Sequence, residues 1–151
     1  METFEVLKLI SGVSSTAIAL VGLIYVVLKF RREEDIRNQD LFFKFREKFS
    51  SDPILKAICI ELEKDEPQFP EDKFSTLDRY NFCGFYEEIS IYMRKGVLDK
   101  HQVLNMMAYF ALQAAKSKEF LKEDISEKDF YWKEFFTFVS EMKELESRQT
   151  R

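Results

Sequence analysis

The run from Leu9 to Leu28, LISGVSSTAIALVGLIYVVL, contains twenty residues without a single charge. Three basic residues follow it at once: Lys29, Arg31 and Arg32. An α-helix rises about 1.5 Å per residue, so the run spans roughly 30 Å, which is the thickness of the hydrocarbon core of a bilayer. We therefore expect residues 1–32 to form an N-terminal segment whose helix is a transmembrane anchor.

The main alternative for this run is a cleaved secretory signal peptide, which needs a basic N-terminal region, a shorter apolar core and a small-residue cleavage site. Here Glu2 and Glu5 oppose a lone Lys8, and bulky residues end the run, so the sequence favours an uncleaved anchor. Basic residues are more numerous after the run than before it. The positive-inside rule then places the N-terminus outside and the rest of the chain in the cytoplasm, as in a single-pass protein of the inner (plasma) membrane.

The chain beyond the anchor is acidic. Four of the 23 basic residues and two of the 27 acidic residues precede Glu33, which leaves residues 33–151 with a formal charge of −6. Such a body repels the phosphates of nucleic acids, so we expect no nucleic-acid partner. Cys59 and Cys83 are spaced neither as a metal site nor as a redox pair, and we expect both to be buried thiols.

No Gly or Pro occurs between Leu23 and Asp52, so we expect the membrane helix to continue into an amphipathic stalk over residues 33–50. The apolar residues of this stalk are Ile36, Leu41, Phe42, Phe45 and Phe49. The phenylalanines can pack within the following domain or across a dimer, and the sequence does not separate the two arrangements.

Residues 51–151 are expected to form a helical bundle, which makes the chain all-α. Ser51 or Asp52 can cap a helix that has Pro53 in its first turn, and the proline-containing loop at 67–70 ends that helix. No sustained alternation of apolar and polar residues predicts a strand.

The next helix is expected from Ser75, which has Asp78 as a capping partner, to Gly96. At 100° per residue it has two apolar faces. One face carries Phe82, Phe85, Tyr86, Ile89 and Met93, and the opposite face carries Leu77, Tyr80, Gly84 and Ile91. A helix that is apolar on two sides is expected to be covered on both.

Two more helices are predicted towards the C-terminus. Asp99 can cap a single buried helix over the uncharged residues 102–115, which are too few to span a bilayer. Ser126 can cap a last, strongly amphipathic helix. Its aromatic residues Trp132, Phe135 and Phe136 are expected to be largely buried.

The segments FYEEI at 85–89 and MRKGVLD at 93–99, with a long apolar helix and a closing aromatic helix around Trp132, resemble an uncharacterised bacterial family, domain-of-unknown-function family 4760. The resemblance implies one N-terminal membrane helix and a helical cytoplasmic domain. It transfers no catalytic residue. The chain departs from the family's pattern at Tyr109 and Phe110, where a tryptophan is expected.

Few residues are candidates for chemistry. His101, the sole histidine, is expected to be exposed at a helix start. Glu87 and Glu88 lie on the flanks between the two apolar faces, so one of them can be partly buried, with a raised pKa unless Arg94 or Arg79 pairs with it. No catalytic constellation, cofactor-binding motif or metal-ligand spacing occurs. We therefore expect a protein that is not an enzyme and that holds no cofactor and no metal.

The anchor itself carries a row of small residues at helical spacing: Ser11, Ser15, Ala19 and Gly22. Such a row lets a second membrane helix approach closely, and it predicts a dimer face. An anchor that merely contains Ser and Ala, without self-association, is the equal alternative.

Two function classes follow from these features. The first is a membrane-anchored interaction module, a homo-oligomer that presents an aromatic-lined cytoplasmic surface to an unknown protein partner. The second is a membrane-tethered sensor or defence effector that binds an apolar small ligand among the bundle's aromatic side chains. The sequence favours the first.

Overall fold

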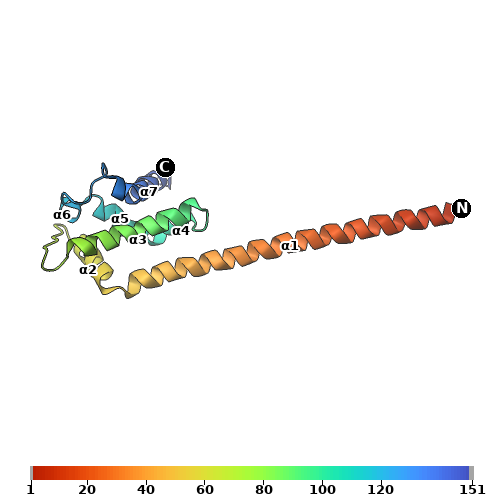
Figure 1. Ribbon diagram of the computed structural model, residues 1–151, viewed down its shortest axis with the longest axis horizontal. Coiled ribbons are helices and arrows are strands. Elements are labelled where there is room, and N and C mark those ends of the chain that lie inside the picture. The colour runs from red at the N-terminus through yellow and green to blue at the C-terminus, as the bar shows by residue number, and fades with distance from the viewer. Residues whose placement is uncertain (1, 150–151) are drawn as a thin grey trace. The chain divides into compact units, whose positions relative to one another are not determined.

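The computed structural model describes the chain from residue 2 to residue 149, with side chains described from residue 20 onwards. All its regular elements within this range are helical, which confirms the predicted all-α fold (Figure 1). The α-helices are α1 (Glu2–Ser51), α2 (Pro53–Leu62), α3 (Thr76–Arg94), α4 (Lys100–Met106), α5 (Ala108–Ala114), α6 (Lys118–Leu121) and α7 (Lys133–Gln149). A 3₁₀ turn, η1 (Phe130–Trp132), precedes α7.

The chain divides into two compact units, one up to Asp40 and one from Leu41. The second unit is the helical bundle, and it includes the last residues of α1. Phe42 and Phe45 are buried there, and the ring of Phe49 lies 5.2 Å from that of Phe85 in α3. The stalk phenylalanines therefore pack within the bundle, and the boundary falls inside the expected 33–50 stalk because these rings join the core.

The starts of α2 and α3 follow from local capping chemistry. Asp52 caps α2: its Oδ1 accepts hydrogen bonds from the backbone N–H groups of Ile54 at 2.8 Å and Leu55 at 3.0 Å. Ser75 and Asp78 form the reciprocal capping box of α3. These side chains satisfy backbone donors that have no partner within the helix, so both predicted starts are confirmed.

Only one of the two apolar faces of α3 is fully covered, although Tyr80 on the other face packs against Trp132. Phe82, Tyr86 and Ile89 are fully buried against the rest of the bundle. On the opposite face Leu77 and Ile91 are exposed, so the expectation that α3 is covered on both sides is wrong. The helices α7 and α2 pack against α3, and the Tyr86 ring on its covered face contacts Phe138 of α7.

The uncharged segment at 102–115 is two short helices rather than one. The helical path breaks at Met107, whose φ of −135° lies outside the helical range. The Met107 carbonyl accepts a hydrogen bond of 3.0 Å from the hydroxyl of Tyr86, which is buried and needs a partner. Buried small residues in α5, Ala108, Ala111 and Ala114, let it lie close to its neighbours.

The last helix begins at Lys133, later than the Ser126 cap predicts. Asp129 instead caps the 3₁₀ turn η1 by accepting from the backbone N–H of Tyr131 at 3.0 Å. Trp132 and Phe135 are buried as expected, whereas Phe136 is only partly buried. Phe138 takes the place that was expected for Phe136, because it is the residue of α7 that faces Tyr86.

Within the part of the chain whose side chains are described, no helix is long and apolar enough to cross a membrane. Of the expected span from Leu9 to Leu28, residues 9–19 lie outside that part.

Truncation of Phe135 tests the position of the core. Phe135→Ala removes a fully buried ring and should lower the free energy of unfolding by about 3–5 kcal/mol. His101→Ala, at an exposed position, should change it by less than about 0.5 kcal/mol. Urea unfolding of both variants measures these changes. Similar unfolding midpoints for the two variants would show that Phe135 does not belong to the core.

Candidate functional site

Between residues 20 and 30, α1 exposes every large apolar side chain that it contains. Their exposed fractions lie between 44% and 68%. The residues are Leu20, Val21, Leu23, Ile24, Tyr25, Val26, Val27, Leu28 and Phe30. Because successive residues turn by 100°, these side chains point in all directions around α1. A helix that is apolar on all sides is ordinarily surrounded by protein or lipid, so this segment is the first candidate contact surface.

Of the four residues proposed as an anchor dimer face, only Gly22 has described surroundings. A methyl group added there would meet nothing within 4 Å, so the fold of one chain leaves room for a side chain. The side chains of Ser11, Ser15 and Ala19 lie outside the described residues.

The interior of the bundle is filled by aromatic side chains in mutual contact. The Phe82 ring lies 5.1 Å from that of Tyr86 and 5.2 Å from that of Phe120. Phe120 in turn contacts Phe69 at 5.2 Å. Burial, followed by the nearby Cys59 and Cys83, raises the pKa of Tyr86 well above its ordinary value. The phenol therefore stays protonated and acts as a structural hydrogen-bond donor.

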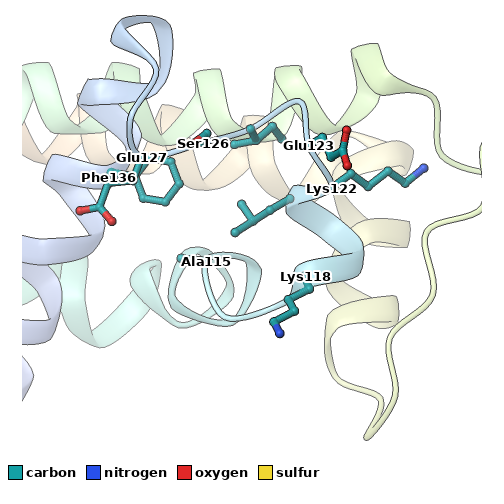
Figure 2. Close-up of a pocket in the computed structure, with 9 residues that line it drawn as sticks. Ala115, Lys118, Lys122, Glu123, Ser126, Glu127 and Phe136 are labelled. Carbon is teal, nitrogen blue, oxygen red and sulfur yellow. The ribbon is translucent and has the colours of Figure 1, made fainter.

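A groove of about 630 Å³ lies on the surface between α5, α6 and the segment before α7. Figure 2 shows Phe136 at one end of it and Lys122 at the other. Ala115, Leu121 and Phe136 give it an apolar floor. The other lining residues are Lys118, Lys122, Glu123, Ile125, Ser126 and Glu127, so four charged side chains surround that floor. A groove of this kind is a poor match for an enclosed apolar ligand site.

The two candidate carboxylates of α3 have different surroundings. Glu88 is half exposed and accepts a hydrogen bond of 3.2 Å from the Lys48 ammonium. Glu87 is partly buried, and its Oε1 has no hydrogen-bond partner. Burial raises the pKa of Glu87, the backbone N–H of Phe135 opposes that rise, and the Glu134 carboxylate adds to it.

Neither arginine that was considered as a partner for these carboxylates pairs with them. Arg94 forms an ion pair with Glu134 at the start of α7. Arg79 is fully buried and donates to the Phe120 carbonyl at 2.9 Å and to Asp124 Oδ2 at 3.0 Å. It thereby ties the segment around α6 to the start of α3. The sequence gives no signal for this role, since the partners lie more than forty residues away.

Glu61 is a second buried charge that the sequence analysis missed. It accepts hydrogen bonds from the ammonium groups of Lys64 at 2.7 Å and Lys73 at 3.3 Å, and from the backbone N–H of Gln68 at 3.1 Å. The Lys64 contact and then the Gln68 contact lower the pKa of Glu61 to about 2. The carboxylate holds the loop between α2 and α3 in place.

The remaining candidates show no arrangement for catalysis. His101 is exposed, as predicted, and its Nδ1 lies 3.1 Å from the side-chain amide of Gln149. Cys59 and Cys83 are buried, which confirms that prediction, and burial raises the pKa of Cys59 to about 12 and raises that of Cys83 as well. Among the described residues, no group of three or more His, Cys, Asp or Glu side chains is placed to hold a metal ion.

Two exposed apolar features of the bundle were not expected. Phe130 and Tyr131 in η1 are 82% and 81% exposed, and the next residue, Trp132, anchors the turn by donating to the Asp124 carbonyl at 2.9 Å. The second feature is the uncovered face of α3. Such side chains, fixed on a rigid support, are typical of contact surfaces for proteins.

No protein-family model, no curated protein and no solved structure matches this chain. The resemblance to family 4760 therefore stays a prediction.

Replacement of Glu61 tests its structural role. Because its pKa falls from an ordinary 4.5 to about 2 on folding, the carboxylate stabilises the fold fully above pH 4.5 and loses this effect as pH falls towards 2. Glu61→Gln should lower the free energy of unfolding at pH 7 by about 2–3 kcal/mol, and the difference from the parent should close in acid. Glu88→Gln, at an exposed ion pair, is the control and should change it by less than about 1 kcal/mol.

Glu87 should behave in the opposite sense. Its pKa is raised on folding, so the ionised carboxylate lowers stability at neutral pH, and this loss disappears as pH falls below 4.5. Glu87→Gln should therefore raise the unfolding midpoint at pH 7 and leave it unchanged at pH 4. A lower unfolding midpoint at pH 7 would mean that the hydrogen bond from the Phe135 backbone N–H stabilises the Glu87 carboxylate by more than burial destabilises it.

Proposed function

We propose that this protein is a membrane-tethered, non-enzymatic interaction module with its N-terminus outside and its helical bundle in the cytoplasm. The observation that carries the proposal is the exposure of the apolar side chains of α1 from Leu20 to Leu28. Their exposure to water would be unfavourable. They continue an uncharged sequence that begins at Leu9, and a bilayer is the environment that would surround them on all sides.

The basic residues after the apolar segment support the orientation. Arg31 and Arg32 follow it directly, and Lys29 has only a long contact of 3.8 Å with Glu33. Positive charge next to a membrane helix is retained on the cytoplasmic side. The resemblance to family 4760 implies the same architecture.

The bundle supplies the interaction surface in this proposal. Its interior is packed with aromatic rings, while Phe130, Tyr131 and Leu77 remain on its surface. Exposed aromatic side chains next to a filled core favour docking of a protein over capture of a small ligand. The small-residue row of the anchor would add self-association in the membrane.

A ligand sensor has less support. Its best candidate is the groove beside Phe136, where Lys118, Lys122, Glu123 and Glu127 surround the apolar floor. An apolar ligand there would leave charged side chains next to its own surface, which is unfavourable.

Membrane extraction tests the tether. The full chain should stay in the pellet when membranes are washed with alkaline carbonate, because an apolar helix within the bilayer is not released by high pH. A variant that lacks residues 1–32 should appear in the supernatant and should keep the helical circular dichroism of the bundle, whose core starts at Phe42.

Two outcomes would contradict the proposal. One is recovery of the full chain in the carbonate supernatant. The other is retention of the shortened variant in the pellet, which would move the membrane contact to the bundle.

A further inference from the structure

The uncovered face of α3 has a regular pattern. Leu77, Gly84 and Ile91 are seven residues apart, so they form one nearly straight row along the helix. The side chains of Leu77 and Ile91 are 64% and 38% exposed. Asn81, Glu88 and Lys95 form a second row with the same spacing beside the first. The face is therefore an apolar ridge with a glycine at its centre and a polar row along one side.

The fold of a single chain does not require glycine at position 84. It lies inside α3 without the positive φ that favours glycine, and a methyl group added there would meet nothing within 4 Å. Glycine inside a helix lowers stability by about 1 kcal/mol relative to alanine. What glycine does permit is the close approach of a second helix, since the distance between packed helices depends on the side chains at their contact.

The pattern around Gly84 is self-complementary. If a second α3 crosses antiparallel at Gly84, each residue of the central row faces the one at the same distance on the other side of the glycine. Leu77 then faces Ile91 of the second copy, which places apolar side chains together. The polar rows of the two copies also meet along one edge, where Glu88 lies beside Asn81 of the second copy, whose side-chain amide can donate to the carboxylate. A two-fold symmetric contact requires this kind of match.

A parallel arrangement of the same two helices lacks this polar match. A two-fold axis along the helices places the polar rows of the two copies on opposite edges of the contact, so Glu88 and Asn81 of different copies stay apart. The polar row therefore favours the antiparallel orientation.

Exposed apolar surface continues beyond the row. Tyr80, at the edge of this face, has its ring 4.7 Å from that of Trp132. The exposed residues Phe130 and Tyr131 directly precede Trp132. A stable interface buries about 600 Å² or more on each partner, which is more than one helical row provides, and the η1 turn extends the surface beside it.

We propose that a second copy of this chain binds to the α3 face, antiparallel and centred on Gly84, so that the bundle is a symmetric dimer. The proposal deepens the proposed function by naming one partner of the bundle. It rests on the residues of α3 and does not depend on the tether.

Pairwise disulfide crosslinking of the full chain in detergent tests this arrangement. Leu77→Cys and Ile91→Cys chains are mixed and oxidised. Disulfide dimers should form in the mixture, and neither variant alone should form them, since each cysteine lies about fourteen residues, roughly 21 Å along the helix, from its own copy. The native thiols are buried, so the parent chain is a suitable blank.

Two further variants make the test specific. Ile60→Cys in α2, at a position as exposed as Leu77, should give no crosslink with Ile91→Cys. Adding Gly84→Leu to both partners should lower the yield of the 77–91 crosslink by roughly tenfold or more, because a bulky side chain separates the helices. Circular dichroism and the unfolding midpoint should show that this variant still folds, since the position has free space.

Three results would overturn the dimer: no crosslink in the mixture, self-crosslinking of Leu77→Cys alone, or an unchanged yield with Gly84→Leu. If one of these results is obtained while the full chain stays in the carbonate pellet, the dimer is rejected and the membrane tether is retained. If the expected crosslink forms but the full chain is recovered in the carbonate supernatant, the membrane tether is rejected and the dimer is retained.

Discussion

Burial of one face of α3 is the constraint on which the rest of the bundle depends. Tyr86 is fully buried on this face, and its hydroxyl must have a partner because an unpaired buried donor is costly. The Met107 carbonyl supplies that partner, and the path between α4 and α5 bends there. The ring of Tyr86 also contacts Phe138 of α7 at 5.3 Å. Tyr86 thus joins α3 to the α4–α5 junction and to α7. All these contacts lie on the buried face of α3, so they do not cover Leu77 and Ile91 on the other face.

Buried charges hold the loops around this core. Arg79 binds the segment that follows α6, and Glu61 binds the loop between α2 and α3. Each is surrounded by groups of opposite charge or by backbone partners, which offset the cost of removing a charge from water. These contacts tie both loops to the bundle, and Trp132 ties η1 to the same segment as Arg79 by donating to the Asp124 carbonyl.

Local chemistry made part of this fold predictable from the sequence. The caps at Asp52 and Ser75 act within three residues, and the apolar spacing of α3 identified its buried face. Long-range contacts were not predictable. The break at Met107 depends on a residue 21 positions away, and Arg79 looks like any surface arginine until its partners are known. The second face of α3 was recognised as apolar, but spacing alone does not tell whether the same chain covers it.

Apolar surface that a single chain leaves exposed is the common feature of the proposed membrane tether and of the proposed α3 dimer. Labelling of Ile24→Cys with a membrane-impermeant maleimide, in membranes opened by freezing and thawing, shows whether lipid covers this part of α1. Ile24 is exposed in the protein alone. If the bilayer surrounds α1 at this position, Ile24→Cys is labelled only after detergent denaturation, whereas Ile60→Cys in the bundle is labelled throughout. Equal labelling of both positions in untreated membranes would contradict the membrane tether.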